Sequence, residues 1–273
     1  MHPPMTTPRE ATPQTIESWA TAFVTSTDLA CKRRPPAIPA TFDAVPAPLR
    51  LDAPGRPAEL EVVAKSKRSL RQGELRDPTK RARLLHTFWH HELQAAELMA
   101  WAVLAFPETP EEFRRGLIRI CGDELRHMRM YEARLVEMGH RVGEFPVRDW
   151  FWQRVPSCET PLQFVALLGL GLEGANLDHA DRYAEWFEAV GDLKGAAVQR
   201  AVGADEVAHV RFAAAWFARL GGGAVAFDAW ADALVPPLSP TMFRGRPLNR
   251  VDRLRAGFPD EFLDALEAFE AKS

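Results

Sequence analysis

Apolar residues recur at three- and four-residue steps along most of the chain, and this periodicity predicts α-helices. No alternating apolar and polar run is long enough to build a β-sheet. Proline, glycine and capping residues divide the pattern into four long helices of about 27–30 residues each. The expected bounds of these helices are Asp77–Phe106, Thr109–Gly139, Thr160–Gly191 and Asp192–Gly223. The second helix is expected to begin with a capping box, Thr109-Pro-Glu-Glu112.

The connections between these helices indicate how they are arranged. Only a few residues join the first helix to the second and the third to the fourth, so each pair is expected to form an antiparallel hairpin. Residues 140–159 separate the two hairpins and are numerous enough to run the length of a bundle. Two hairpins joined by one long crossover form the ferritin-like type of four-helix bundle, so we expect an all-α fold of this type.

Two flanking parts lie outside the predicted bundle, which spans residues 77–223. Residues 1–76 are expected to form an N-terminal extension, with one helix at about 14–30 and a proline-rich stretch that lies on the body of the protein. Residues 224–273 are expected to form a C-terminal tail packed on the bundle, with helices near 225–234 and 259–271.

Composition narrows the class of protein. The 273 residues are 47% apolar and 26% charged, which is typical of a soluble globular chain. The net charge of −3 gives no global electrostatic reason to expect nucleic acid as a partner. Three cysteines without CxxC spacing, no leader pattern in residues 1–10 and no long apolar span together predict a reduced, cytoplasmic protein without a membrane partner.

Each predicted bundle helix carries a carboxylate near the middle of an otherwise apolar face. The second and fourth helices add a histidine three residues after the glutamate, so both pairs read Asp-Glu-x-x-His. The polar members of the four faces are Glu92, Glu124, His127, Glu173, Glu206 and His209. In an i, i+3 pair both side chains project from one face of a helix toward one metal ion.

Charge balance favours two bound metal ions. Burying ionised carboxylates is costly unless a positive charge compensates, and no lysine or arginine lies on these faces. Two divalent cations would balance four glutamates. Oxygen and imidazole ligands suit iron, manganese or zinc, and the absence of inward thiolates disfavours an iron–sulfur cluster. The alternative is a bundle in which the buried glutamates are protonated.

Residues beside Glu92 offer alternatives to this ligand set. Glu97 could replace Glu92, but it lies five residues further along the helix and points about 140° away. His90 and His91 flank Glu92, and at most one of them could reach the site. We expect both to have a structural role or to contact the metal ligands without binding the metal themselves.

Other residues next to the predicted ligands have two interpretations each. Asp123 and Asp205 are expected either to hydrogen-bond the histidine rings of the opposite hairpin or to lie on a solvated face. Tyr131 and Cys121 lie on the ligand face and could carry electrons or a radical, although core packing explains them as well. The glycines of the third helix mark either close packing or room for a ligand beside Glu173; they are Gly169, Gly171 and Gly174.

Two further segments suggest functions. The Lys65–Arg83 run holds eight basic and two acidic residues, which fits either a solvated helix start or a surface for an anionic partner.

Aromatic residues in the crossover are expected to cover the pocket at the metal site; they are Trp150, Phe151 and Trp152.

Four sequence motifs carry a family resemblance. HHELQAAEL, DELRH, GLEGANLDHA and GADEVAHVRFAAAWF resemble a bacterial ferritin-like family, domain of unknown function 455, over about residues 78–220. The wider superfamily implies that the two histidines and four glutamates of the helix faces ligate a di-iron centre, with Glu124 and Glu206 bridging the ions. A related branch of the superfamily hydroxylates a modified tRNA base, so a tRNA-modifying activity stays an alternative that involves the basic 65–83 run.

The expected function rests on open coordination positions. Six protein ligands around two metals leave room for dioxygen or peroxide, so we expect an oxygen-dependent oxidase or hydroxylase of an unidentified small molecule. Electrons would come from a separate donor, because the chain has no flavin or nicotinamide fingerprint. Alternatives are iron handling as a ferroxidase or peroxide scavenger, and a binding module that uses the metals as a structural clamp. The N-terminal extension and the C-terminal tail make assembly into a storage cage awkward. The metal pair could also be Mn/Fe or Mn instead of iron alone.

Overall fold

The computed structural model describes residues 13–65 and 70–270. Three expectations fall partly or wholly outside these ranges: the missing leader pattern in residues 1–10, residues 66–69 of the basic run, and the end of the last predicted helix at residue 271. Within the described ranges the fold is all-helical, as predicted, and an isolated bridge between Val62 and Val147 is the only β-type pairing. None of the helices in these ranges combines the length and apolar character needed to span a bilayer.

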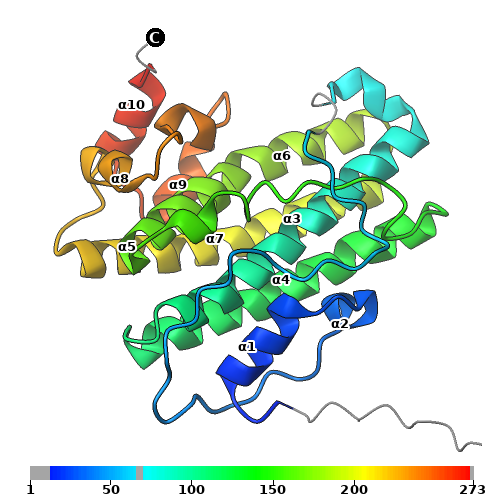
Figure 1. The fold of residues 1–273 in the computed structure, drawn as a ribbon. Helices are drawn as coiled ribbons and strands as arrows, with labels where there is room; N and C mark the ends of the chain where they lie inside the picture. Colours follow the sequence, from blue (N-terminus) through cyan, green and yellow to red (C-terminus); the bar gives the residue numbers. More distant parts are fainter. Residues whose placement is uncertain (1–12, 66–69, 271–273) are drawn as a thin grey trace, which may run out of the picture.

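Four long helical segments form the centre of the structure (Figure 1). They are α3 (Pro78–Ala105), α4 (Glu111–Glu137), the continuous run of α5 (Pro161–Phe164), η3 (Val165–Glu173) and α6 (Gly174–Ala189), and α7 (Leu193–Gly221). The first and third of them start at the predicted capping residues, because Asp77 accepts hydrogen bonds from the backbone of Thr79 and Lys80, and Thr160 forms a capping box with Gln163. The predicted starts of the first and third long helices are therefore confirmed.

The predicted capping box at the start of the second helix is wrong. The residue that precedes α4 is Pro110, which has no side-chain oxygen to offer the first turn. Thr109 lies in the turn before it, where its hydroxyl donates to the carbonyl of Phe106 at 2.7 Å and its backbone N–H donates to the same carbonyl at 3.2 Å. Thr109 therefore closes the turn between α3 and α4, and the helix boundary lies at Pro110, one residue later than the predicted capping box requires.

The third long helix is interrupted by a π-helical stretch that the periodicity did not predict. It covers η3, Val165–Glu173, and ends at a predicted ligand. A Cβ at Gly169 would overlap the Cβ of Ala213 on α7, so this glycine allows the two helices to approach closely. Gly174 faces Phe258 and Arg253 of the C-terminal tail. The glycines therefore mark close packing rather than room for a ligand.

The N-terminal extension contains two helices where one was expected. α1 (Ile16–Thr25) ends before Ser26, and α2 (Leu29–Arg33) begins after Asp28, whose carboxylate accepts from the backbone N–H of Ala30. The proline-rich stretch then runs along the surface of the first hairpin (Figure 1), as predicted. It is held by its backbone, since Leu49 donates to the carbonyl of Leu104 at 2.9 Å. A short 3₁₀ helix, η1 (Gln72–Arg76), leads into α3.

The C-terminal tail forms a separate group of short helices at the end of the molecule that holds α5 (Figure 1). These are α8 (Phe227–Ala233), η4 (Pro240–Phe243), α9 (Arg250–Arg255) and α10 (Asp260–Ala268). A fully buried ion pair at 2.8 Å, between Arg253 and Asp178, attaches the tail to α6. Trp230 of α8 donates its indole N–H to the carbonyl of Ala166, inside the π-helical stretch. The tail therefore packs directly behind the segment that carries Glu173.

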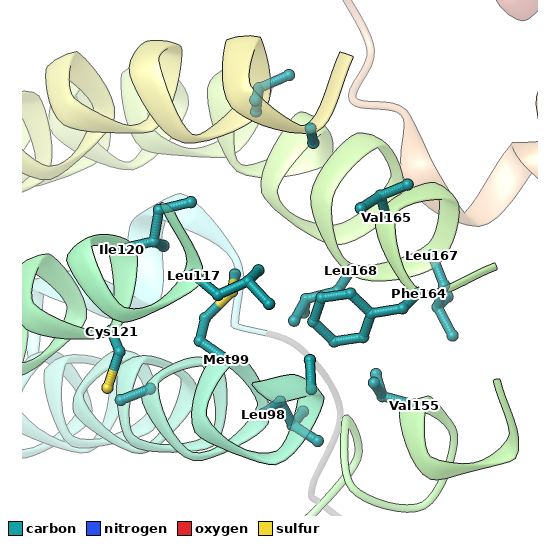
Figure 2. Close-up of a cluster of buried hydrophobic side chains, with 14 of the residues drawn as sticks. Leu98, Met99, Leu117, Ile120, Cys121, Val155, Phe164, Val165, Leu167 and Leu168 are labelled. Atoms are coloured by element: carbon teal, nitrogen blue, oxygen red, sulfur yellow. The ribbon is translucent and has the colours of Figure 1, made fainter. Parts of the chain in front are cut away.

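The apolar core continues between the two hairpins beside the buried glutamates and histidines. Figure 2 shows Phe164, at the start of the third long helix, projecting toward Met99 of α3 and Leu117 of α4. Another short helix, η2 (Val155–Ser157), closes this region from the crossover, with Val155 buried. Cys121 lies at the edge of the same cluster, and burial raises the pKa of its thiol, so it packs as a neutral apolar side chain.

Candidate metal centre

The polar members of the four helix faces meet inside the structure. All four glutamates and both histidines are buried, and none is more than 6% exposed. Ligand atoms of Glu92, Glu124, His127 and Glu206 lie within 4.8 Å of one another. An ion with bonds of about 2.1 Å places opposite ligands about 4.2 Å apart, so this spacing suits a single ion. These four residues, drawn from α3, α4 and α7, could therefore hold a metal ion.

The two histidines make matching contacts, one from α4 and the other from α7. His127 directs Nδ1 toward Glu92 at 3.5 Å and Glu124 at 3.3 Å. His209 directs Nδ1 toward Glu124 at 3.0 Å and Glu206 at 3.2 Å. Glu124 faces both rings, whose centroids are 5.8 Å apart. The same ring nitrogen of each histidine is therefore directed at the carboxylates.

The other ring nitrogen of each histidine meets an aspartate from the opposite hairpin. Nε2 of His127 lies 3.2 Å from Asp205, and Nε2 of His209 lies 3.3 Å from Asp123. An ionised carboxylate only accepts hydrogen bonds, so each ring donates its Nε2–H and keeps Nδ1 as the nitrogen available to a metal ion. The hydrogen bonds predicted for these aspartates are present.

Arg126 joins the two halves of this arrangement. Its Nη2 donates to Asp123 at 3.0 Å and to Asp205 at 2.9 Å. One guanidinium, about 40% exposed, therefore fixes both aspartates that orient the histidines. This role was not predicted from the sequence, although Arg126 lies between the glutamate and the histidine of the DELRH motif.

Glu173 completes the set from the third long helix. Burial, together with the nearby charges of Glu206 and Glu124, raises its pKa well above the ordinary value for glutamate. One turn further on, the side-chain amide of Asn176 donates to Glu206 at 3.2 Å. Asn176 was also missed, although it follows Glu173 at the same i, i+3 spacing as the histidines follow their glutamates. In the third helix an amide therefore occupies the position that a histidine occupies in α4 and α7.

The electrostatics of the site are those of a negative cluster that lacks cations. Burial and the adjacent Glu124 raise the pKa of Glu92 well above its usual range. Burial alone would lower the pKa of His127, but hydrogen bonds to Glu124 and Glu92 outweigh it and raise that pKa to about 12. No arginine or lysine of the described residues forms an ion pair with the four glutamates. Protons bound by the histidines and glutamates therefore balance part of the negative charge.

This donor set fits divalent metal ions. The buried residues supply carboxylate oxygens and imidazole nitrogens without a thiolate, a combination that binds iron, manganese and zinc. The histidine rings are held in one orientation by partners behind them, as is usual for metal-ligating histidines. Two divalent cations would replace the protons that otherwise balance the charge of the carboxylates.

Glu97, the alternative to Glu92, has a different role. Its carboxylate is fully buried and forms ion pairs at 2.7 Å with both Lys32 and Arg56, while the indole of Trp152 donates to it at 2.8 Å. These partners hold the pKa of Glu97 below its ordinary value although burial acts to raise it. Glu97 therefore anchors the N-terminal extension and the crossover to α3, and it belongs to no metal cluster among the described residues.

The remaining polar residues of the HHELQAAEL motif hold the crossover in place. His90 pairs with Asp149 at 2.9 Å, and Asp149 also accepts from Arg56. Gln94 donates to the carbonyl of Arg148 at 3.2 Å and accepts from the backbone N–H of Phe151 at 3.0 Å. This explains the expected structural role of His90. The motif therefore combines one inward carboxylate with side chains that bind the crossover.

Of the three crossover aromatics predicted to cover the site, only Phe151 contacts a residue adjacent to a predicted ligand. It stacks on His91, the residue before Glu92, with ring centroids 5.1 Å apart. Trp152 turns toward Glu97, and Trp150 lies under Arg154. Burial lowers the pKa of His91 to about 3, so its ring is neutral.

Two surface hollows among the described residues lie away from the cluster. One is lined by residues of α2, α4 and the following loop, and the other by the segment after α2 together with α4. Neither is lined by a predicted ligand. In the basic run, Arg81 donates to the carbonyl of Leu75 and pairs with Asp192, and Lys80 pairs with Glu74, so these two cations have intramolecular partners.

Comparison with known proteins identifies a family. A search of curated proteins found no match, and a search of solved structures found none either. The family model described as "Protein of unknown function (DUF455)" matches residues 7–264. This match is longer than the 78–220 stretch that carried the resemblance, and it includes α1, α2 and the tail helices α8 and α9. The chain therefore belongs to the DUF455 family.

Proposed function

We propose that the protein is a di-metal carboxylate oxidoreductase that uses dioxygen to oxidise or hydroxylate a small molecule. One observation carries this proposal: two Glu-x-x-His pairs from different hairpins direct Nδ1 of their histidines at shared buried carboxylates. We interpret the four long helices as a ferritin-like bundle, in which such pairs of glutamate and histidine hold two metal ions.

The ligands of each ion are inferred from the contacts. Glu92, Glu124, His127 and Glu206 form the first group, which could hold one ion. His209 and Glu173 would complete a second site with Glu124 and Glu206, since both glutamates lie beside them. Glu124 faces both histidines, so its carboxylate would be shared between the two ions.

Iron or manganese ions bound by these residues would supply the electrons that reduce dioxygen. The chain itself contributes the surroundings of that chemistry. Burial excludes water, Asp123 and Asp205 hold the imidazoles in the metal-binding tautomer, and the amide of Asn176 orients Glu206. Turnover would need electrons from an external donor, because the chain provides no flavin or nicotinamide fingerprint.

Iron titration followed by oxygen exposure tests the proposal. The metal-free protein should bind two Fe²⁺ per chain under anaerobic conditions, and addition of oxygen should consume oxygen and give a transient absorbance. Glu173→Gln should retain one ion and lose the oxygen reaction, because the second site is incomplete. Glu185→Gln, at an exposed position on α6, is the matched control and should behave as the natural sequence does.

Three results would contradict the proposal. A chain that binds neither iron nor manganese would exclude a redox-active metal centre. Protein that holds two iron ions and is inert to oxygen would leave the metals as a structural clamp. Uptake of many more than two ions per chain would indicate iron handling instead.

A further inference from the structure

The two tyrosines of this chain lie on one line of aromatic rings. The sequence has 16 phenylalanines and only two tyrosines, Tyr131 and Tyr183. Phe88 contacts both, with ring centroids 5.7 Å from Tyr131 and 4.9 Å from Tyr183. Tyr183 in turn contacts Trp186 at 5.3 Å. The line therefore crosses from α4 to α3 and ends on α6.

The inner end of this line lies beside the metal ligands. Tyr131 follows His127 by four residues on the same face of α4, which is about one helical turn. Its side chain is 2% exposed, and burial together with the charges of Glu92 and Glu206 raises the pKa of its hydroxyl. A phenol is therefore held next to the cluster and away from solvent.

The outer end reaches the surface of α6. Tyr183 and Trp186 are both half-buried, and Arg182 lies over both rings, at 5.3 Å and 5.7 Å from their centroids. Phenol and indole are the side chains that lose one electron most readily, whereas the benzene ring of Phe88 does so only with difficulty. Packing alone would be served by phenylalanine, which the chain uses eight times as often as tyrosine.

We propose that Tyr131, Phe88, Tyr183 and Trp186 form a one-electron route between the metal centre and the α6 surface, with Phe88 as the bridge between the two tyrosines. This inference rests on the proposed function only for its inner oxidant, the metal pair after reaction with dioxygen.

Electrons and protons balance at each step of the route. Tyr131 gives one electron to the oxidised metal pair and its hydroxyl proton to a basic oxygen at that centre, which leaves a neutral phenoxyl radical. Tyr183 then supplies one electron through Phe88, the same base returns the proton to Tyr131, and the half-buried Tyr183 releases its own proton toward solvent. Trp186 supplies the next electron, a proton restores the Tyr183 hydroxyl, and an external one-electron reductant restores the indole.

Light-driven oxidation of the metal-free, full-length protein tests the route without the metal centre. A ruthenium polypyridyl photosensitiser would be attached at Glu185→Cys, an exposed position next to Trp186, in a Cys31→Ser background. After a flash, an external quencher takes an electron from the excited sensitiser, and the resulting Ru³⁺ oxidises Trp186. Transient absorbance and freeze-quench EPR then follow the tyrosyl radicals. Because the chain has two tyrosines, Tyr131→Phe and Tyr183→Phe assign every tyrosyl signal.

The expected result is a radical on both tyrosines of the otherwise natural sequence. Tyr183→Phe should remove most of the Tyr131 signal, Phe88→Leu should slow its appearance, and Trp150→Phe, outside the line, should change neither. A radical confined to Tyr183, or a Tyr131 signal that is indifferent to Tyr183→Phe and Phe88→Leu, would overturn the route. In a second arm, iron-loaded protein is exposed to oxygen, and failure of that reaction alone would count against the proposed function and not against the route.

Discussion

His127 of α4 and Asp205 of α7 meet across the two hairpins, with Nε2 and Oδ2 3.2 Å apart. His209 and Asp123 form the reciprocal pair at 3.3 Å. Each hairpin therefore provides a histidine directed at the carboxylates and the aspartate that orients the histidine of the other hairpin. Neither histidine is fixed until the two hairpins have docked, so metal binding and hairpin docking are expected to be coupled.

Replacing either aspartate should weaken metal binding without unfolding the protein. We expect Asp205→Asn to lower metal affinity by about 10–100-fold, because an amide no longer enforces the tautomer that leaves Nδ1 free. Asp123→Asn should act similarly on the other histidine. Competition with a chromophoric chelator measures the effect, and Asp228→Asn, an exposed site on α8, is the control. Equal affinities for Asp205→Asn and Asp228→Asn would show that the hydrogen bond does not matter for the metal.

Arg126 should influence both histidines at once, because its guanidinium binds both aspartates. We expect Arg126→Gln to reduce the affinity for both ions, by less than Asp205→Asn, while the melting temperature changes little, since surface ion pairs contribute about 0–1 kcal/mol. Arg129→Gln removes a neighbouring exposed cation of α4 and should leave the affinity unchanged. A loss confined to one ion, or a loss of the same size in Arg129→Gln, would contradict this role.

Metal binding should release protons and strengthen as pH rises. In the metal-free protein the pKa of His127 is raised to about 12, so the ring holds a proton that a metal ion must displace. Each proton released raises the apparent affinity by about tenfold per pH unit. Calorimetric titrations in buffers of different ionisation enthalpy count these protons. An affinity that is constant from about pH 6.5 upward would show that His127 binds no metal.

The stability of the metal-free protein should change in the opposite direction. The folded-state pKa of His127 lies above the unfolded value of about 6.5, so its contribution to stability is complete below that pH and declines as pH rises toward about 12. Thermal unfolding of metal-free protein over this range should show a falling melting temperature. Saturation with metal should remove the trend.

Lys32 is expected to be essential for stability, because it is fully buried against Glu97. Lys32→Met should destabilise the fold by about 3 kcal/mol, since it removes one of the two cations, Lys32 and Arg56, that pair with the buried carboxylate of Glu97. The matched change Lys194→Met affects an exposed pair with Glu137 and should cost less than about 1 kcal/mol. Urea unfolding compares the two variants, and similar midpoints would refute the importance of burial.

Two glycines in long helices should respond oppositely to alanine. At Gly169 the added methyl group overlaps Ala213 of the neighbouring helix, so Gly169→Ala should destabilise by about 1–3 kcal/mol. At Gly122 of α4 the same methyl group meets nothing within 4 Å, so Gly122→Ala should stabilise by about 1 kcal/mol. Denaturant unfolding measures both, and a loss of stability in Gly122→Ala would contradict this interpretation of the packing.

Local signals explain why much of the fold could be predicted from the sequence. Asp77-Pro78 and Thr160-Pro161 start helices through their own side chains, and the left-handed Gly222 ends α7. The spacing of the polar residues along amphipathic helices explains why four of them converge; these are Glu92, Glu124, His127 and Glu206. That they bind metal stays a prediction.

Contacts between distant parts of the chain explain the features that the sequence did not predict. Lys32, Arg56 and Asp149 reach α3 from segments 41 or more residues away from their partners, and no periodic pattern connects such positions. Thr109 does not cap α4 because the residue at the helix boundary is Pro110, and the Thr109 hydroxyl donates back to the carbonyl of Phe106. The roles of Arg126 and Asn176 depend on which helices lie side by side, which spacing within one helix cannot show.

The π-helical stretch limits how the length of this chain can vary. A turn of π-helix contains more residues than a turn of α-helix. Every residue gained or lost in an α-helix rotates the remainder of that helix by about 100°. Deleting one residue between Val165 and Leu172 would therefore swing Glu173 away from the interior or pull Asp178 off Arg253. Relatives that hold metal in this way should tolerate substitutions in this stretch far more readily than insertions or deletions.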